Sequence, residues 1–367
     1  MGEILNLSKN EFFFEHPVLS ADALPKLTAR EICQYPTEAM LLQRLSAFHR
    51  VDPENLCLCN GAEQALKIAL GTVANMKDTT LLVPAPTWEH YWKLSTEFGV
   101  KTAAYHYEEN KDGTFELNRH CLEDKIDKAK RVVLLIASPS NPLGCRTDDK
   151  TIHEIVEKAS EKGYSIIDQT YAGFSGGPEE SLASCLNSLP NTLITRSLSK
   201  YYGMAGLRVG FIAASPQVQK SFAIYSDYLG FNCFAERFAS ECLDRHSEFV
   251  KIADSMVRNR EQLKAYYSSL PGFKPFESAA NFLLVRVPAG YPEHLLRHGI
   301  KVRTFSDKAI GDCARITIHP ENIVKRIEEI TSDFCSTADL KQQKPTRILQ
   351  EKIGLMPQTL NTACGPR

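Results

Sequence analysis

The chain has 367 residues, of which 43% are hydrophobic and 24% are charged, and its formal net charge is −1. This composition is typical of a folded globular protein long enough for two domains, and the near-neutral charge argues against a nucleic-acid partner. No apolar run approaches the roughly 20 residues that a membrane helix needs, and the first residues lack the features of a secretory signal. We therefore expect a cytoplasmic protein that binds neither membranes nor nucleic acids.

The cysteines and histidines show no clear metal-binding pattern. The eleven cysteines are scattered, and Cys57 and Cys59 are separated by one residue instead of the two found in paired zinc motifs. His294 and His298 stand four residues apart with no acidic residue between them, and we interpret them as part of an ordinary helix face. We expect reduced thiols and no metal.

The first part of the chain predicts an N-terminal arm over residues 1–36 and a large domain over residues 37–245. In the large domain short apolar strands alternate with helical stretches, which predicts a doubly wound, mostly parallel α/β sheet of seven strands. The predicted strands are Leu56–Cys59, Thr80–Val83, Lys101–Tyr105, Arg131–Ala137, Ser165–Asp168, Leu193–Ser197 and Gly210–Ala214. The predicted helices of this part are Glu63–Val73, Trp88–Phe98 and Asp148–Lys162.

The remaining chain predicts a small C-terminal α/β domain over residues 246–335 and an extension over residues 336–367. A long helix is expected near Glu248–Ser269, and the pattern changes after Pro271. The later predicted elements are strands at Asn281–Val287 and Ala314–Ile318 and helices at Glu293–His298 and Asn322–Phe334.

The segment Ser197–Gly210 carries the strongest chemical signal. Lys200 follows small hydroxyl residues, and glycines and Arg208 come after it. A lysine in a tight, hydroxyl-lined turn can form a Schiff base with an aldehyde, and an arginine held by glycine-rich backbone can grip a doubly charged phosphate. An aldehyde and a phosphate together indicate pyridoxal 5'-phosphate (PLP). The alternative is a Ser/Gly-rich loop with a surface lysine, which the other motifs disfavour.

Several other predicted strands are followed by residues suited to the same cofactor, at the edge where ligands gather in open α/β sheets. Asp168 ends a strand, where its carboxylate can keep a pyridine nitrogen protonated. Asn141 can donate to the ring oxygen of PLP, which Tyr171 can share, and Trp88 can stack on the ring. Taken singly, these residues also fit a polar strand end, a turn and a core aromatic position.

Two further positions suit anions. The backbone of Gly61, Ala62 and Glu63 opens a helix after a strand, where free N–H groups bind phosphate, although plain helix capping explains the same residues. Arg315, in a late strand, can hold a carboxylate or phosphate of a substrate, although a lone arginine more often forms a surface ion pair.

The order of these motifs resembles fold-type I PLP enzymes of the class I/II aminotransferase superfamily, from about Leu5 to Phe334. Within this superfamily the chain is most similar to the histidinol-phosphate aminotransferase branch. The segments that mark the branch are Asn6–Glu11, Gln34–Pro36, Asn60–Glu63, Pro86–Trp88, Ala279–Phe282 and Ala314–Thr317.

The resemblance implies a role for each cofactor-site residue. Lys200 is the Schiff-base lysine and moves the proton, Asp168 pairs with the pyridinium nitrogen, and Tyr171 and Asn141 contact the ring oxygen. The residues that the resemblance implies for cofactor binding are Tyr35, Gly61, Ala62, Glu63, Trp88, Asn141, Asp168, Tyr171, Ser197, Ser199, Lys200 and Arg208.

The resemblance also implies how substrate and partner are bound. Arg315 binds the acidic group of the substrate, with Arg303 nearby and Asn141 beside it. Tyr35 reaches the cofactor phosphate of the other subunit, which implies a homodimer with shared active sites.

The chain departs from this branch at positions where the substrate is expected. Gln169 and Thr170 replace a Glu-Ala pair, and Trp88 replaces a tyrosine. His319 stands in place of a glycine, and Phe12–Pro17 replaces an Asn-Pro-Gly-rich entry segment.

We expect a PLP-dependent aminotransferase that moves an amino group from an amino acid or an amino-alcohol phosphate-like donor to a 2-oxo acid. A PLP-dependent decarboxylase, lyase, cyclase or oxidase of the same fold remains the alternative, because substrate orientation decides which Cα bond breaks. A non-catalytic PLP-binding regulator is not expected, because such proteins carry a DNA-binding domain ahead of the fold and the opening motif here begins at Asn6.

Overall fold

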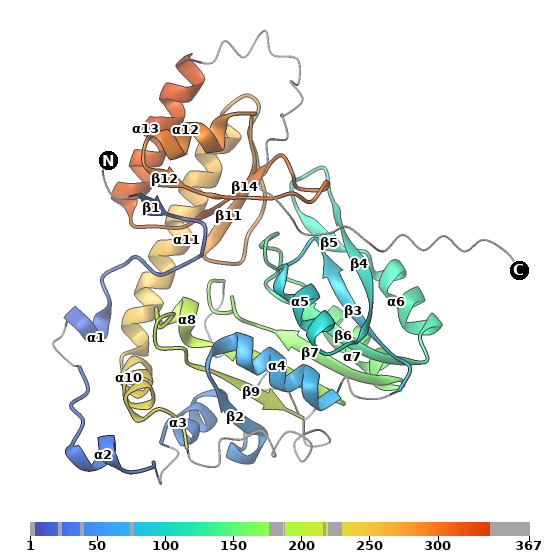
Figure 1. Cartoon of the computed structure of the whole chain (residues 1–367). Helices are drawn as coiled ribbons and strands as arrows, with labels where there is room; N and C mark the ends of the chain where they lie inside the picture. Colours follow the sequence, from blue (N-terminus) through green and yellow to red (C-terminus); the bar gives the residue numbers. More distant parts are fainter. Residues whose placement is uncertain are drawn as a thin grey trace, which may run out of the picture.

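The computed structural model of the chain describes residues 4–20, 24–36, 40–73, 77–175, 186, 188–215, 218 and 230–337 (Figure 1). Most of the predicted extension, residues 338–367, lies outside the described residues. In the described part of the chain no helix is both long and apolar enough to cross a membrane.

A mixed sheet of eight strands forms the larger part of the molecule. Its strands are β2 (Leu56–Cys59), β3 (Thr79–Ala85), β4 (Lys101–Glu109), β5 (Phe115–Leu117), β6 (Arg131–Ala137), β7 (Gly163–Asp168), β8 (Thr192–Ser197) and β9 (Gly210–Ala214). Their order is β2-β9-β8-β7-β6-β3-β4-β5, with parallel pairing from β8 through to β4. Strand β9 is antiparallel to both of its neighbours, and β5 adds an antiparallel edge that the sequence did not predict. The predicted mostly parallel α/β sheet is confirmed.

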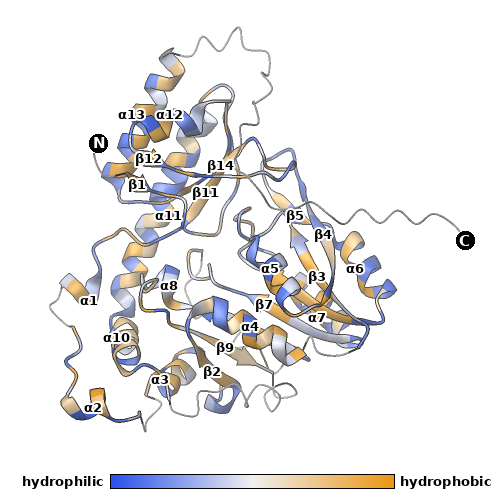
Figure 2. Ribbon diagram, viewed as in Figure 1, coloured by the Kyte–Doolittle hydropathy of each residue, from blue (hydrophilic) through white to orange (hydrophobic). Residues whose placement is uncertain are grey.

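Helices cover both faces of this sheet, which explains its apolar strand sequences. Alternate residues of β6 belong to two separate hydrophobic clusters, with Val132, Leu134 and Ile136 in one and Val133, Leu135 and Ala137 in the other. A strand buried on both faces has a continuous apolar sequence instead of an alternating one. Figure 2 shows this concentration of hydrophobic residues in the strands. The covering helices are α4 (Gly61–Val73) and α5 (His90–Glu97) on one face, and α3 (Met40–His49), α6 (Arg119–Lys128), α7 (Asp149–Ser160) and α10 (Cys233–Asp244) on the other.

A second, antiparallel sheet of four strands forms the small-sheet region, with the order β10-β11-β14-β13. Helix α11 runs from the large sheet to this region (Figure 1). The strands are β10 (Lys274–Pro275), β11 (Phe282–Arg286), β13 (Arg303–Thr304) and β14 (Cys313–Thr317), and the helices are α11 (His246–Ser268), α12 (Tyr291–Arg297) and α13 (Glu321–Thr337). The predicted boundaries between the arm and the two domains stay predictions.

The N-terminal segment joins the small-sheet region before the chain enters the large sheet. Strand β1 (Leu5–Asn6) pairs in parallel with β12 (Ile300–Lys301). The short helices α1 (Pro17–Ser20) and α2 (Ala29–Cys33) follow, and Thr28 and Glu31 form a capping box that starts α2. This path carries the first residues of the chain across the cleft described below.

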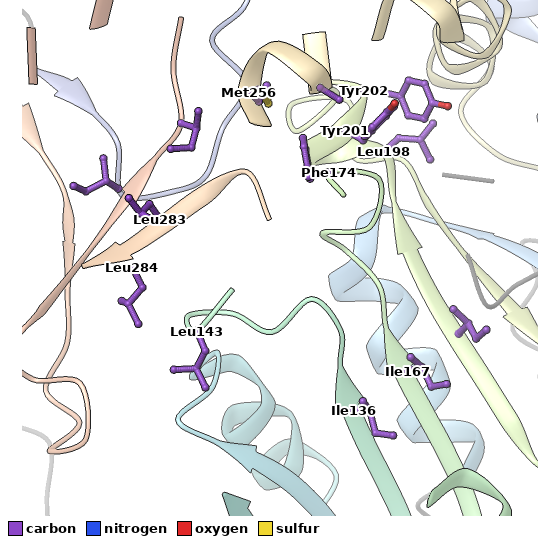
Figure 3. Packing of buried hydrophobic residues seen from close by; sticks show 14 of the residues in the cluster. Ile136, Leu143, Ile167, Phe174, Leu198, Tyr201, Tyr202, Met256, Leu283 and Leu284 are labelled. Atoms are coloured by element: carbon purple, nitrogen blue, oxygen red, sulfur yellow. The ribbon is translucent and has the colours of Figure 1, made fainter. Parts of the chain in front are cut away.

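One hydrophobic cluster connects the two sheets. Ile136 and Ile167 of the large sheet and Leu283 and Leu284 of β11 belong to it, together with Leu143 from the loop after β6 (Figure 3). Close packing holds such side chains in place, so the loop that follows β6 is fixed between the two sheets.

Candidate active site

A cleft of about 720 Å3 opens at the carboxyl ends of the parallel strands, between the large sheet and the small-sheet region. Pockets of this size are typical of small-molecule and cofactor sites. The cleft is lined by twelve of the fourteen site residues predicted from the sequence, namely Ala62, Glu63, Trp88, Asn141, Asp168, Tyr171, Ser197, Ser199, Lys200, Arg208, Arg303 and Arg315. Gly61 and Tyr35 do not line it.

Lys200 lies on the short helix α8 (Leu198–Tyr201) directly after β8. The Ser197 side chain caps this helix by accepting a hydrogen bond from the Ser199 backbone N–H at 3.1 Å. The Lys200 ammonium donates to the backbone oxygen of Lys9 at 2.8 Å. Burial, assisted by the positive charge of Arg315, lowers the pKa of Lys200 to about 8. A larger share of this amine is therefore neutral and nucleophilic near neutral pH than for an ordinary lysine.

Arg208 lies against the first residue of α4. Gly61 has a φ of 77°, and a Cβ atom at this position would lie 2.8 Å from Nη2 of Arg208. Only glycine therefore allows the guanidinium to approach the start of the helix this closely. The hydroxyl of Ser199 is buried and has no hydrogen-bond partner in the described part of the chain. An arginine, an unpaired hydroxyl and a helix start that line the same cleft fit a phosphate group.

Asp168 is 5% exposed and is held by three donors. The Tyr91 hydroxyl donates to Oδ2 at 2.6 Å, and the N–H and hydroxyl of Thr170 donate to Oδ1 at 2.9 and 2.7 Å. Burial and the nearby Asp168 charge raise the pKa of Tyr91 well above its usual range, so this hydroxyl stays protonated. A fixed carboxylate at the end of β7 fits the ring nitrogen of PLP.

Tyr91 and Thr170 were not predicted as site residues. Tyr91 stands three residues after Trp88, at the start of a predicted helix that follows a strand, and this spacing is the signal that identifies it. The two rings pack edge to face with centroids 5.6 Å apart. Trp88 is 37% exposed and lines the cleft, so one face of the indole is available for stacking.

The Tyr171 hydroxyl joins three segments of the chain. It accepts hydrogen bonds from Nδ2 of Asn10 at 3.0 Å and Nδ2 of Asn141 at 3.3 Å. Burial raises the pKa of Tyr171, although the Arg315 charge partly offsets this effect. Asn10 is fully buried and was not singled out from the sequence, since its contacts to Tyr171 and Thr317 are distant along the chain.

Arg315 is a buried cation whose hydrogen-bond partners in the described part of the chain are all neutral. Its Nη1 donates to Oδ1 of Asn141, its Nη2 donates to the backbone oxygen of Ser8 at 2.6 Å, and its Nε has no partner. Burial and the neighbouring Arg303 lower its pKa to about 10, which leaves it charged at neutral pH. A buried charge without a counter-ion is unfavourable, so this site favours an anion. The surface ion pair considered for Arg315 is not found among the described residues.

Tyr35 lies apart from the cleft. It is 69% exposed and lines a separate hollow of about 410 Å3 near α2 and α10. Of the departures from the aminotransferase pattern, Trp88 and Thr170 line the main cleft. Gln169 and His319 do not line it, and the His319 ring instead stacks on Phe13 with centroids 4.0 Å apart.

His294 and His298 lie beside Asp333, and one ligand atom of each falls within 4.8 Å of the others. His298 Nδ1 contacts the backbone oxygen of His294 at 2.9 Å, and His294 Nε2 contacts that of Ile330 at 3.2 Å. Both rings therefore already take part in hydrogen bonds within and between α12 and α13. The expectation that no metal binds there stays a prediction.

Comparisons with known proteins agree with this geometry. The family model for aminotransferases of class I and II matches residues 2–330. A histidinol-phosphate aminotransferase from Caldanaerobacter subterraneus subsp. tengcongensis is 27% identical over 304 residues, which cover 81% of this chain and 84% of that protein.

Solved structures share the fold. The histidinol-phosphate aminotransferase of Sinorhizobium meliloti in complex with pyridoxal-5'-phosphate superposes with a TM-score of 0.77 at 19% identity, covering 90% of this chain and 92% of that one. The L-threonine-O-3-phosphate decarboxylase of Porphyromonas gingivalis superposes with a TM-score of 0.74 at 19% identity, covering 91% and 100% of the two chains. At these identities the likeness identifies the fold, and a shared fold alone does not choose between the two reactions.

Proposed function

This chain belongs to the aminotransferase class I and II family and is a PLP-dependent aminotransferase, and we propose that its amino donor carries an acidic group. The donor class that we propose is an amino acid or an amino-alcohol phosphate, with a 2-oxo acid as acceptor. The observation that carries the proposal is Arg315, a buried cation without an acidic partner among the described residues, in the same cleft as Lys200.

The described residues fit PLP. Arg208, the Ser199 hydroxyl and the start of α4 suit its phosphate, while Asp168 suits its ring nitrogen and Tyr171 its ring oxygen. When bound, PLP supplies an electron-withdrawing ring that stabilises negative charge at the substrate Cα atom.

The protein contributes orientation and proton transfer. Arg315 binds the acidic group of the substrate and thereby fixes which Cα bond faces Lys200. With its lowered pKa, the Lys200 amine accepts the Cα proton as a general base and later returns it as a general acid. Trp88 lines the cleft and offers an apolar ring on which the ring of PLP can stack.

We further propose a homodimer in which Tyr35 contacts the cofactor of the partner subunit. The arm supports this proposal, because Tyr35 and several apolar side chains near it are exposed in the single chain. These residues are Leu19, Leu24, Ile32 and Met40. The nine cysteines in the described part of the chain are free thiols, which supports a reducing compartment such as the cytoplasm.

The test is amino transfer by the PLP-loaded protein. A panel of L-amino acids, histidinol phosphate and simple amines without an acidic group is offered with 2-oxoglutarate, and the new amino acid and any released carbon dioxide are quantified. Transfer from acidic donors, with the corresponding keto product, is the expected result. Carbon dioxide release without amino transfer would support the decarboxylase instead, and transfer from amines that lack an acidic group would remove the role of Arg315.

A further inference from the structure

The outer part of the cleft carries more positive charge than the cofactor and one acidic group require. The charged residues that line the cleft are Lys9, Lys93, Lys200, Arg208, Lys301, Arg303 and Arg315 on the positive side and Glu63, Glu89 and Asp168 on the negative side. Lys200, Arg208 and Asp168 serve the cofactor in the proposed function. Five cationic residues then face two carboxylates in the space left for the substrate.

Two of these cations are direct neighbours. Arg303 of β13 and Arg315 of β14 are cross-strand partners in the antiparallel register, and both line the cleft. Like charges at directly opposite positions repel each other, so this arrangement needs an anion close by. Arg315 contacts only neutral groups in the described part of the chain, whereas Arg303 has an acidic partner.

That partner is Glu89, which comes from the other side of the cleft. Arg303 Nη2 donates to Oε1 of Glu89 at 3.0 Å, and the Arg303 guanidinium also lies 6.0 Å from the centre of the Phe305 ring. Glu89 occupies the N-cap position of α5, but its side chain makes no capping hydrogen bond. Its carboxylate is therefore not engaged in starting the helix and is available to Arg303.

The ion pair between Arg303 and Glu89 is exposed, so Arg303 can exchange Glu89 for another anion. The Glu89 side chain is 66% exposed and that of Arg303 is 44% exposed. An ion pair this exposed is weak, because water solvates both charges. A substrate anion that reaches Arg303 can therefore displace Glu89 at little cost.

We propose that Glu89 is a built-in counter-ion that occupies Arg303 between substrates and is displaced by a second acidic group of the substrate. This inference rests on the proposed function, in which Arg315 holds the first acidic group. It makes Glu89 a specificity-determining residue, because Glu89 competes with any substrate that carries a distal carboxylate. A substrate with a single acidic group leaves Arg303 on Glu89.

The test is calorimetric binding of unreactive acids to the PLP-loaded enzyme. Glutarate carries two carboxylates and butyrate carries one, and both are titrated into the wild type and into Glu89→Gln. We expect Glu89→Gln to bind glutarate on the order of fivefold more tightly, because the competing carboxylate is gone, and to bind butyrate as the wild type does. Glutarate binding that is unchanged or weaker in Glu89→Gln would overturn the proposal.

Two further variants separate this effect from a general change of charge. Glu97→Gln removes a carboxylate from the same helix, where it pairs with Lys67 at 3.3 Å outside the cleft lining, and should leave glutarate binding unchanged. Arg303→Gln should weaken glutarate binding and abolish the effect of Glu89→Gln in the double variant. Equal gains from Glu97→Gln and Glu89→Gln would contradict the counter-ion role.

These measurements need no turnover. A protein that shows the glutarate shift but transfers no amino group would overturn the proposed function and support the counter-ion. An active aminotransferase without the shift would overturn the counter-ion alone.

Discussion

On the large-sheet side of the cleft, Asp168 and Tyr171 are buried and each is fixed by two or more hydrogen bonds, whereas on the small-sheet side Arg303 is exposed and shares one hydrogen bond with Glu89. The buried side suits the ring and phosphate of a cofactor, which the reaction leaves unchanged. The exposed side suits substrates that differ from one half of the reaction to the other. The side chains that suit the cofactor are therefore held rigidly in advance, whereas the side chains that suit the two substrates make contacts that can exchange.

Among the substitutions on the large-sheet side of the cleft, Lys200→Ala should reduce activity most. We expect kcat to fall by roughly 10³- to 10⁴-fold, because the variant lacks the amine that we assign to the transfer of the Cα proton. Steady-state kinetics with the best donor measures this loss. Lys67→Ala, which removes a lysine outside the cleft lining, serves as the control and should keep full activity. Turnover by Lys200→Ala at more than a tenth of the wild-type rate would remove this lysine from the mechanism.

Arg315→Gln tests whether Arg315 serves the substrate or the cofactor. Loss of the buried guanidinium should lower kcat/KM for acidic donors about a hundredfold, because the substrate carboxylate loses its charge-assisted partner. The variant should still bind the cofactor, since the phosphate of PLP is assigned to Arg208 and the start of α4. Loss of cofactor with substrate affinity retained would place Arg315 on the cofactor side instead.

The effect of pH on the rate of PLP binding, which depends on the protonation of Lys200, should be of intermediate size. Because its pKa is lowered to about 8, the neutral amine increases about tenfold between pH 7 and pH 9 and then levels off. The rate at which the cofactor-free protein combines with PLP should follow this curve, as measured by stopped-flow absorbance. A midpoint near that of an ordinary lysine would show that the cleft does not lower the pKa of Lys200.

The smallest expected effect is that of Tyr91→Phe. Removal of one hydrogen bond to Asp168 should lower kcat about fivefold, in line with roughly 1 kcal/mol for such a bond. Thr170 still holds the other carboxylate oxygen, so the cofactor should remain bound. Kinetics and the cofactor dissociation constant are measured together, and an unchanged kcat would show that Tyr91 only fills space.

The cofactor side of the cleft could be predicted because its residues follow apolar strands directly. Lys200 and Asp168 stand at strand ends, where the topology of a parallel sheet brings them together. The contacts of Asn10 and Glu89 could not be found this way. Asn10 meets Tyr171 across 161 positions and Glu89 meets Arg303 across 214, so only the folded chain reveals these pairs.

The strands likewise divide into those that the sequence predicts and those that only the folded chain reveals. Strand β6 was predicted with its observed ends, because seven apolar-rich residues give a clear signal. Strands β10, β12 and β13 have two residues each, which is too short for any alternation to appear in the sequence. Their positions depend on pairing with distant strands, so sequence periodicity could not identify the strand that carries Arg303.

If Lys200 and PLP together perform amino transfer in this cleft, an absorbance spectrum shows it most directly. The wild type and Lys200→Ala are loaded with PLP, and spectra are recorded before and after an acidic amino donor and then a 2-oxo acid. We predict that the visible band of the wild type disappears with the donor and returns with the 2-oxo acid, and that Lys200→Ala does not complete this cycle. A wild type without a visible band, or a Lys200→Ala protein that cycles like the wild type, would contradict this role of Lys200.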